Sequence, residues 1–272
     1  MLATVSGLFA VVFYSLGTLL QGRDLLQART GSQHAAQRRM VLLFAVLALV
    51  VHFVNVVQVI AVDGGYDFGF FKIATLFSWT IALIVVISSL RKPLDNLFLA
   101  LFPIAILSIL SALLLPGSAA PQGDLEGGVA LHIMLGIVAF SIITIAAGQS
   151  VFIAWLNREL KQKHFSPVLQ HLPPLQTMEA LLFELIWAGF FMLLAVIVSG
   201  FMFMEDMFAQ HLAHKTFFTL ISTAVFGVLL WGRHQLGWRG RTAYRWTLAG
   251  FGFLIVAYFG AKFVLELLLD RV

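Results

Sequence analysis

The sequence predicts an all-α fold, a polytopic membrane bundle of eight transmembrane helices that forms a single integral membrane domain over residues 1–272. Hydrophobic residues make up 60% of the chain and charged residues only 11%, and the mean hydropathy is +0.96. Apolar runs of about 18 or more residues, long enough to cross the hydrocarbon core as helices, recur along the whole chain. Basic and acidic connections alternate between these runs, which supports their number.

The expected helices follow the eight apolar runs, at residues 3–20, 40–62, 70–90, 95–115, 129–155, 178–203, 214–232 and 243–268. No positive charge precedes the first run, so we interpret it as a membrane span and not as a cleaved signal peptide. The loop at 116–128 contains proline and glycine and separates the fourth run from the fifth. Pro173 and Pro174 precede the sixth run, where proline costs no helical hydrogen bond. The last two runs are separated by a short basic turn, GRHQLGWRGR.

The distribution of basic residues predicts the orientation in the membrane. Of the 17 lysines and arginines, 13 fall in the first, third, fifth and seventh connections, whereas the other connections carry mostly aspartate and glutamate. Basic connections stay in the cytoplasm of bacteria. Both termini are therefore expected on the periplasmic side, in a multi-pass protein of the bacterial inner membrane.

Several classes of function are excluded by what the sequence lacks. There is no cysteine, so this chain forms no disulfide, attaches no haem through thioethers and exchanges no thiols. We find no phosphate-binding loop and no paired nucleophile and base. The basic connections are too short and scattered for nucleic-acid binding, so the lipid bilayer is the expected large partner.

Two histidines lie at equal depth near the periplasmic surface. His132 begins the 129–155 helix and His214 begins the 214–232 helix, each within about one turn of the end. Imidazoles at one depth on two helices can hold haem iron as axial ligands. Lys215, with Lys72 at the same side, could pair with the propionates. His211, next to His214 at a spacing of three, is a further candidate at this periplasmic end, although capping or snorkelling remains the simpler explanation of such residues.

A deeper polar group lies in the 40–62 helix, where His52 is about 15 Å from the periplasmic end. Asn55 and Gln58 follow it and suggest one polar stripe. Buried polar residues in a membrane are candidates for function, although a hydrogen bond to a neighbouring helix would also explain them. Lys262 and Glu266, four residues apart in the last helix, are expected to form an ion pair.

Several segments of the second half resemble one known family. They are LHIMLGIVAFSIITIAAGQSVFIAW at 131–155, LPPLQTMEALLFELIWAGF at 172–190, HLAHKTFFTLISTAVFGVLLWGRHQLGWRGRTAYRWTLAGF at 211–251 and VAYFGAKFVLE at 256–266. They resemble the cytochrome c assembly (CcsA/CcmC-like) family of haem-handling membrane proteins, in its HemX/YpjD-type branch. The resemblance implies haem b held near the periplasmic face by histidines beside a tryptophan-rich loop. His132 matches the first of these histidines, and His52 resembles the intramembrane histidine of the family.

The chain departs from the family pattern in two places. AQHLAHKT stands where a tryptophan-rich segment would precede the seventh helix, and the second periplasmic histidine after the last helix has no counterpart. These departures argue against a direct cytochrome c synthase. The resemblance then implies a haem carrier or chaperone, not a catalyst, that binds, exports or senses haem with cytochrome c maturation or haem biosynthesis proteins as partners. From depth alone, His214 could replace the missing ligand.

Two alternatives remain open on the sequence alone. The polar stripe of His52 could line the path of a small-solute or ion transporter, although we find no internal repeat of the kind common in transporters. A regulatory or scaffold protein of haem biosynthesis would instead bind a protein partner through the basic cytoplasmic turns.

Overall fold

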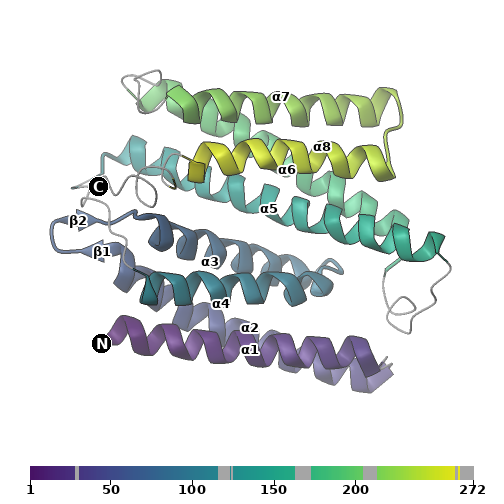
Figure 1. The fold of residues 1–272 in the computed structure, drawn as a ribbon, viewed down its shortest axis with the longest axis horizontal. Coiled ribbons are helices and arrows are strands. Elements are labelled where there is room, and N and C mark those ends of the chain that lie inside the picture. The colour runs from purple at the N-terminus through teal and green to yellow at the C-terminus, as the bar shows by residue number, and fades with distance from the viewer. Residues whose placement is uncertain are drawn as a thin grey trace. The chain divides into compact units, whose positions relative to one another are not determined.

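The computed structural model describes residues 1–27, 31–115, 123, 125–162, 173–204, 213–260 and 263. His211, Lys262 and Glu266, all singled out in the sequence, lie outside these residues. The helices fall into two compact units, the first containing α1–α4 and the second containing α5–α8. Figure 1 shows the helices of each unit running side by side. The expectation of one membrane domain over residues 1–272 stays a prediction.

The first unit is built from four helices and a small hairpin. Its α1 packs against α2 and α4, and α3 packs against the same two helices, which closes a ring of four. Because short connections join consecutive helices, neighbours in the ring run antiparallel. The elements are α1 (Leu2–Gln27), α2 (Gly31–Ile60), β1 (Ala61–Val62), β2 (Gly65–Tyr66), α3 (Phe70–Ser89), a short 3₁₀-helix η1 (Asp95–Leu97) and α4 (Phe98–Leu114).

The hairpin between α2 and α3 was not expected from the apolar runs. β1 and β2 pair antiparallel, with Ala61 opposite Tyr66 and Val62 opposite Gly65. The turn needs a residue that adopts positive φ, and Gly64 supplies it with φ of 94°. An Asp-Gly pair between two short strands is a strong hairpin signal, so the sequence VDGGY contained the information.

Hydrogen bonds between helices hold the first unit together where the side chains are apolar. Trp79 Nε1 donates to the carbonyl oxygen of Leu49 at 3.0 Å, which joins α3 to α2. Thr75 Oγ1 donates to the carbonyl oxygen of Ser108 at 2.9 Å, which joins α3 to α4. Such bonds stabilise helix pairs in a membrane. Because lipid tails are as apolar as leucine side chains, the hydrophobic effect contributes little to the association of helices there.

The second unit has the same ring of neighbours. Its α5 packs against α6 and α8, and α7 packs against the same two helices. Ser222 Oγ on α7 donates to the carbonyl oxygen of Gly250 on α8 at 2.8 Å. The elements are α5 (Gly127–Lys161), α6 (Leu175–Phe203), α7 (Ala213–Gln235), α8 (Gly240–Ile255) and a π-helical segment η3 (Val256–Gly260) that directly continues α8.

These helices identify an all-α, polytopic membrane protein. Within the described residues, seven helices, α1 to α7, are long and apolar enough to cross a membrane. Helix α8 has 16 α-helical residues and continues through η3 to Gly260. The predicted eighth span ends at residue 268, beyond the described part of that helix, so the count of eight and the side of the termini stay predictions.

Several helices extend beyond the apolar runs at their basic ends. Helix α1 continues to Gln27 where the run ends at 20, α2 begins at Gly31 and not at 40, and α5 continues to Lys161. High hydropathy identifies the part of a helix that contacts lipid. The helical backbone hydrogen bonds can extend beyond that part, into residues that contact water. The basic ends of these three helices are therefore helical and are not loops.

Candidate functional site

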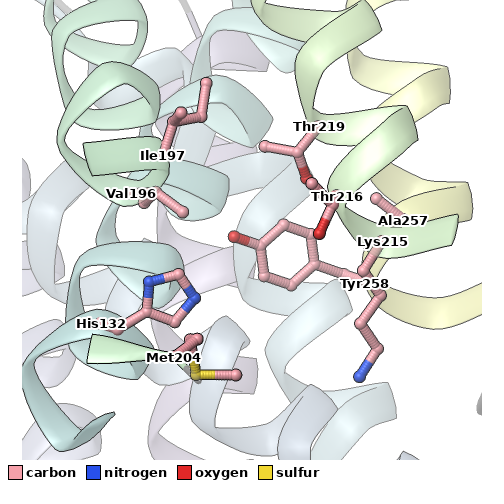
Figure 2. A pocket seen from close by; sticks show the side chains of 9 residues that line it. All are labelled: His132, Val196, Ile197, Met204, Lys215, Thr216, Thr219, Ala257 and Tyr258. Carbon is pink, nitrogen blue, oxygen red and sulfur yellow. The ribbon is translucent and has the colours of Figure 1, made fainter. Parts of the chain in front are cut away.

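A pocket opens at one end of the second unit, and all four helical segments contribute to its wall. Its cavity volume is about 110 Å³, smaller than the roughly 300–1,000 Å³ of typical small-molecule pockets. The start of α5, the end of α6, the start of α7 and the segment after α8 all meet there (Figure 2). The lining residues are His132, Val196, Ile197, Met204, Lys215, Thr216, Thr219, Ala257 and Tyr258.

His132 is oriented by α6. Its Nδ1 lies 3.0 Å from Ser199 Oγ, and the same hydroxyl donates to the carbonyl oxygen of Val196 at 3.0 Å. A serine has one proton to donate, so when that proton goes to Val196, Nδ1 of the imidazole is the donor to Ser199. The proton is then on Nδ1, and Nε2 carries a lone pair.

The His132 imidazole is only partly buried and lines the pocket. A histidine whose other nitrogen donates to a fixed oxygen is the usual form of a metal-binding imidazole, because the hydrogen bond sets both the tautomer and the ring orientation. The contact with Ser199 thus holds the His132 ring at the pocket wall.

The rest of the pocket combines apolar walls with a few polar groups. Val196, Ile197 and Ala257 supply aliphatic surface, and Met204 lies beside His132 (Figure 2). Lys215 and Thr219, one turn apart on α7, contribute an ammonium and a hydroxyl. The ammonium end of Lys215 points away from Thr219 (Figure 2). An apolar cleft with a few convergent polar groups is the typical form of a cofactor pocket.

His214 is not among the lining residues of this pocket. It is partly exposed, and its Nε2 is a buried atom without a hydrogen-bond partner in the described residues. Consecutive residues on a helix point about 100° apart. Because Lys215, Thr216 and Thr219 form the pocket side of α7, His214 lies at its flank. The pairing of His132 with His214 on one iron stays a prediction.

The remaining sequence candidates lie in the first unit or outside the described residues. Lys72 forms an ion pair with Asp67, with Nζ 2.5 Å from Oδ2, and Asp67 Oδ1 also accepts from the Gly69 backbone N–H. These contacts lie at the start of α3. The Lys72 ammonium, which the sequence predicts to pair with a haem propionate, is thus paired with Asp67. His211, as noted, is not described.

His52 on α2 is completely buried and packs against Tyr14 of α1. Tyr14 Oη lies 3.2 Å from its Nδ1, and its Nε2 has no hydrogen-bond partner in the described residues. Asn55, also buried, donates to the carbonyl oxygen of Ala3 at 2.8 Å. Gln58 is exposed, so the predicted stripe was wrong beyond Asn55. Six residues turn a helix by about 240° from His52, which places Gln58 on another face.

Comparison with known proteins supports a specific family. The cytochrome C assembly protein family matches residues 40–269. The chain belongs to this family. It is 29% identical to inner membrane protein YpjD of Escherichia coli K12 over 266 residues, 97% of this chain and 99% of the relative. It is 32% identical over 157 residues to an uncharacterized 28.8 kDa protein of Azospirillum brasilense, 55% of this chain and 58% of that protein. No solved structure matches the chain.

Sequence reasoning did not assign to the site Ser199, which contacts His132, nor Met204 and Tyr258, which line the pocket. Ser199 looks like an ordinary small residue of an apolar span, and no pattern distinguishes it. Met204 follows the last turn of α6 and was assigned to no site. Tyr258 carried a weak signal, because it lies one turn before Lys262 near the expected periplasmic end of the last helix.

Proposed function

We propose that this protein is an eight-span bacterial inner-membrane protein, with both termini in the periplasm, that binds haem b at the periplasmic end of its second unit. One observation carries the proposal. The His132 imidazole lines the apolar pocket at this end of the unit, and the contact of its Nδ1 with Ser199 Oγ at 3.0 Å orients the ring.

The residues that line the pocket offer donors suited to haem, and its cavity of about 110 Å³ would have to widen to admit the ring. His132 would coordinate the iron, and Val196, Ile197 and Ala257 would contact the porphyrin ring. Lys215 would pair with a propionate at the pocket edge, because a carboxylate needs a cation or water near a membrane surface. When bound, haem supplies an iron with open axial positions, a flat apolar ring and two carboxylates. The protein supplies a donor, an apolar slot and a cation.

The family indicates the process in which this pocket works. Membership of the cytochrome C assembly protein family suggests a role in cytochrome c biogenesis. The relative YpjD is by its name an inner membrane protein of Escherichia coli, which supports the same location here. The chain has no cysteine and cannot form a thioether to haem itself. We therefore propose a carrier or chaperone that passes haem to cytochrome c maturation or haem biosynthesis proteins.

The test is haem binding by the full-length protein purified in detergent. Titration with haem is expected to give a Soret band with a saturable endpoint, and His132→Ala should weaken binding by about tenfold or more, at least 1.4 kcal/mol. His234→Ala is the matched control, because His234 is an exposed histidine at the opposite end of α7. Binding that is absent, or equal in His132→Ala and the wild type, would overturn the proposal.

A further inference from the structure

The turn between α7 and α8, residues 236–239, has a backbone fixed by its own hydrogen bonds. The backbone N–H groups of Leu236 and Trp238 both donate to the carbonyl oxygen of Gly232 in the last turn of α7, at 2.9 and 3.2 Å. Gly237 has a φ of 66°, in the left-handed region that favours glycine. The α7–α8 turn is therefore a defined structure that can hold side chains in fixed positions.

Two charged side chains connect the α7–α8 turn to helix α6. Arg233 Nη1 donates to the carbonyl oxygen of Trp238 at 3.2 Å, and the Arg233 guanidinium lies 4.4 Å from the centre of the Phe183 ring on α6. Glu179 Oε1, also on α6, accepts the backbone N–H of Gly240 at 2.9 Å. Arg233 and Glu179 thus hold the two ends of the turn against α6.

Three further arginines of this region have no such structural contact. Arg239, Arg241 and Arg245 are exposed, and within the described residues their guanidinium groups form no ion pair or hydrogen bond. Arg241 and Arg245 are four residues apart on α8, so they lie on one face of the helix, where like charges repel and destabilise it. The supported turn therefore brings together positive charges that the described chain leaves uncompensated.

The end of α5 adds positive charge to the same region. Asn157 Nδ2 would lie 4.0 Å from a Cβ atom at Gly240, so the last turns of α5 run beside the start of α8 (Figure 1). Arg158 and Lys161 follow on α5 and are both exposed. The site is at the opposite end of α5 from His132.

A pair of tryptophans lies next to these charges. The rings of Trp238 and Trp246 are 5.3 Å apart between centroids, and both are partly exposed. The Trp238 ring also packs closely on Gly232, where a Cβ atom would lie 2.4 Å from it. Tryptophan is enriched at the headgroup level of membranes. The apolar runs that flank the turn end at 232 and begin at 243, which places the turn at that level.

We propose that the α7–α8 turn and the start of α8 bind an anionic phospholipid through its phosphate. Arg241 and Arg245 would donate to the phosphate oxygens, because the planar guanidinium matches phosphate in a two-bond geometry. Trp238 and Trp246 would contact the glycerol and the upper acyl chains. A phospholipid fits this surface better than free phosphate because it combines an anion with apolar chains, as the surface combines arginines with tryptophans. The inference does not rest on the proposed function.

The test is phospholipid binding by the full-length protein, delipidated in detergent and followed by native mass spectrometry. Phosphatidylglycerol and phosphatidylcholine are the two probes, since both carry a phosphate but only the first has a net negative charge. The wild type is expected to bind phosphatidylglycerol at least about tenfold more tightly than phosphatidylcholine. The double variant Arg241→Gln/Arg245→Gln should weaken phosphatidylglycerol binding by about tenfold or more and leave phosphatidylcholine binding unchanged.

The matched control removes the same charge elsewhere. Arg23→Gln/Arg39→Gln changes two exposed arginines of the first unit and should retain the wild-type affinity for phosphatidylglycerol. An equal loss in both double variants would show that total charge attracts the lipid and would overturn the inference. Arg241→Lys/Arg245→Lys keeps both charges and should keep the preference for phosphatidylglycerol, which separates loss of the site from loss of the fold.

Two further outcomes would also overturn the inference. Inorganic phosphate in large excess should leave bound phosphatidylglycerol in place, because it lacks the acyl chains that contact the tryptophans. Displacement by inorganic phosphate would instead indicate a site for the free anion. Equal affinity of the wild type for phosphatidylglycerol and phosphatidylcholine would leave the basic turn to a protein partner.

Discussion

The hydroxyl of Ser199 on α6 lies 3.0 Å from Nδ1 of His132 on α5 and donates its own proton to the carbonyl oxygen of Val196. When Ser199 donates to Val196, its oxygen accepts from Nδ1 and the lone pair of the imidazole is on Nε2. It also links the ligand to a neighbouring helix, so the ring cannot rotate without breaking the bond. A serine within an apolar span thereby controls the chemistry of a histidine on another helix.

Removing this hydroxyl should weaken haem binding without removing a ligand. In Ser199→Ala, Nδ1 loses its acceptor and the ring can rotate or take the other tautomer. We expect the dissociation constant for haem to rise by about 10- to 100-fold, as for other groups that orient metal ligands. Titration followed by the Soret band measures the change. Ser141→Ala is the control, because the buried hydroxyl of Ser141 has no partner in the described residues; equal affinities in the two variants would contradict the role of Ser199.

His214→Ala tests whether His214 is a ligand of the iron beside His132. Sequence depth suggested His132 and His214 as an axial pair, whereas the pocket wall includes Tyr258 and not His214. We expect His214→Ala to bind ferric haem within about threefold of the wild type, since no lining group is lost. A loss of affinity as large as that of His132→Ala, together with a changed spin state in the absorption spectrum, would favour the histidine pair.

The role of Lys215 can be tested with a chemically altered ligand. Lys215→Ala should weaken binding of haem by about 1 kcal/mol, or roughly fivefold, if the ammonium pairs with a propionate at a partly wet site. Haem dimethyl ester has no carboxylates, so its affinity should be the same for the variant and the wild type. Lys161→Ala, an exposed lysine at the other end of α5, is the matched control. An equal loss for haem and its ester would argue against pairing.

Much of this architecture could be predicted from the sequence because the bilayer restricts the possibilities. Apolar runs locate the helices, and the spacing from a helix end gives depth. Depth alone indicated that His132 and Lys215 would share one end of the bundle, and both line the pocket. Helix ends were less predictable. An apolar run ends where the helix leaves the lipid, whereas helix α2 begins at Gly31, nine residues before its apolar run.

Rotation about the helix axis could not be predicted with the same success. A span that is apolar on all sides gives little indication of which face packs inward. For that reason Gln58 was assigned to the face of His52 although it is exposed, and His214 was placed in the site although it does not line the pocket. The π-helical turn that directs Tyr258 depends on packing between helices and has no sequence pattern of its own.

The buried contact between Tyr14 and His52 in the first unit should contribute to the free energy of unfolding. Tyr14→Phe removes the hydroxyl 3.2 Å from His52 Nδ1 and leaves that nitrogen without this partner. We expect a loss of about 1 kcal/mol, between the typical value for membrane hydrogen bonds and the cost of a buried unpaired group. Thermal unfolding in detergent measures the change. Tyr66→Phe, an exposed tyrosine of β2, should cause no loss, and equal midpoints for both variants would contradict the prediction.

The orientation of the chain can be determined with single cysteines, because the natural sequence has none to give a background signal. Glu126 and Gln162 flank the two ends of α5 and are both exposed. If basic connections are cytoplasmic, Glu126→Cys should react with a membrane-impermeant maleimide in cells with a permeable outer membrane. Gln162→Cys should react only after the inner membrane is opened. The reverse pattern would place the His132 pocket at the cytoplasmic face and exclude a periplasmic haem site, whereas labelling of both without opening would contradict a span at α5.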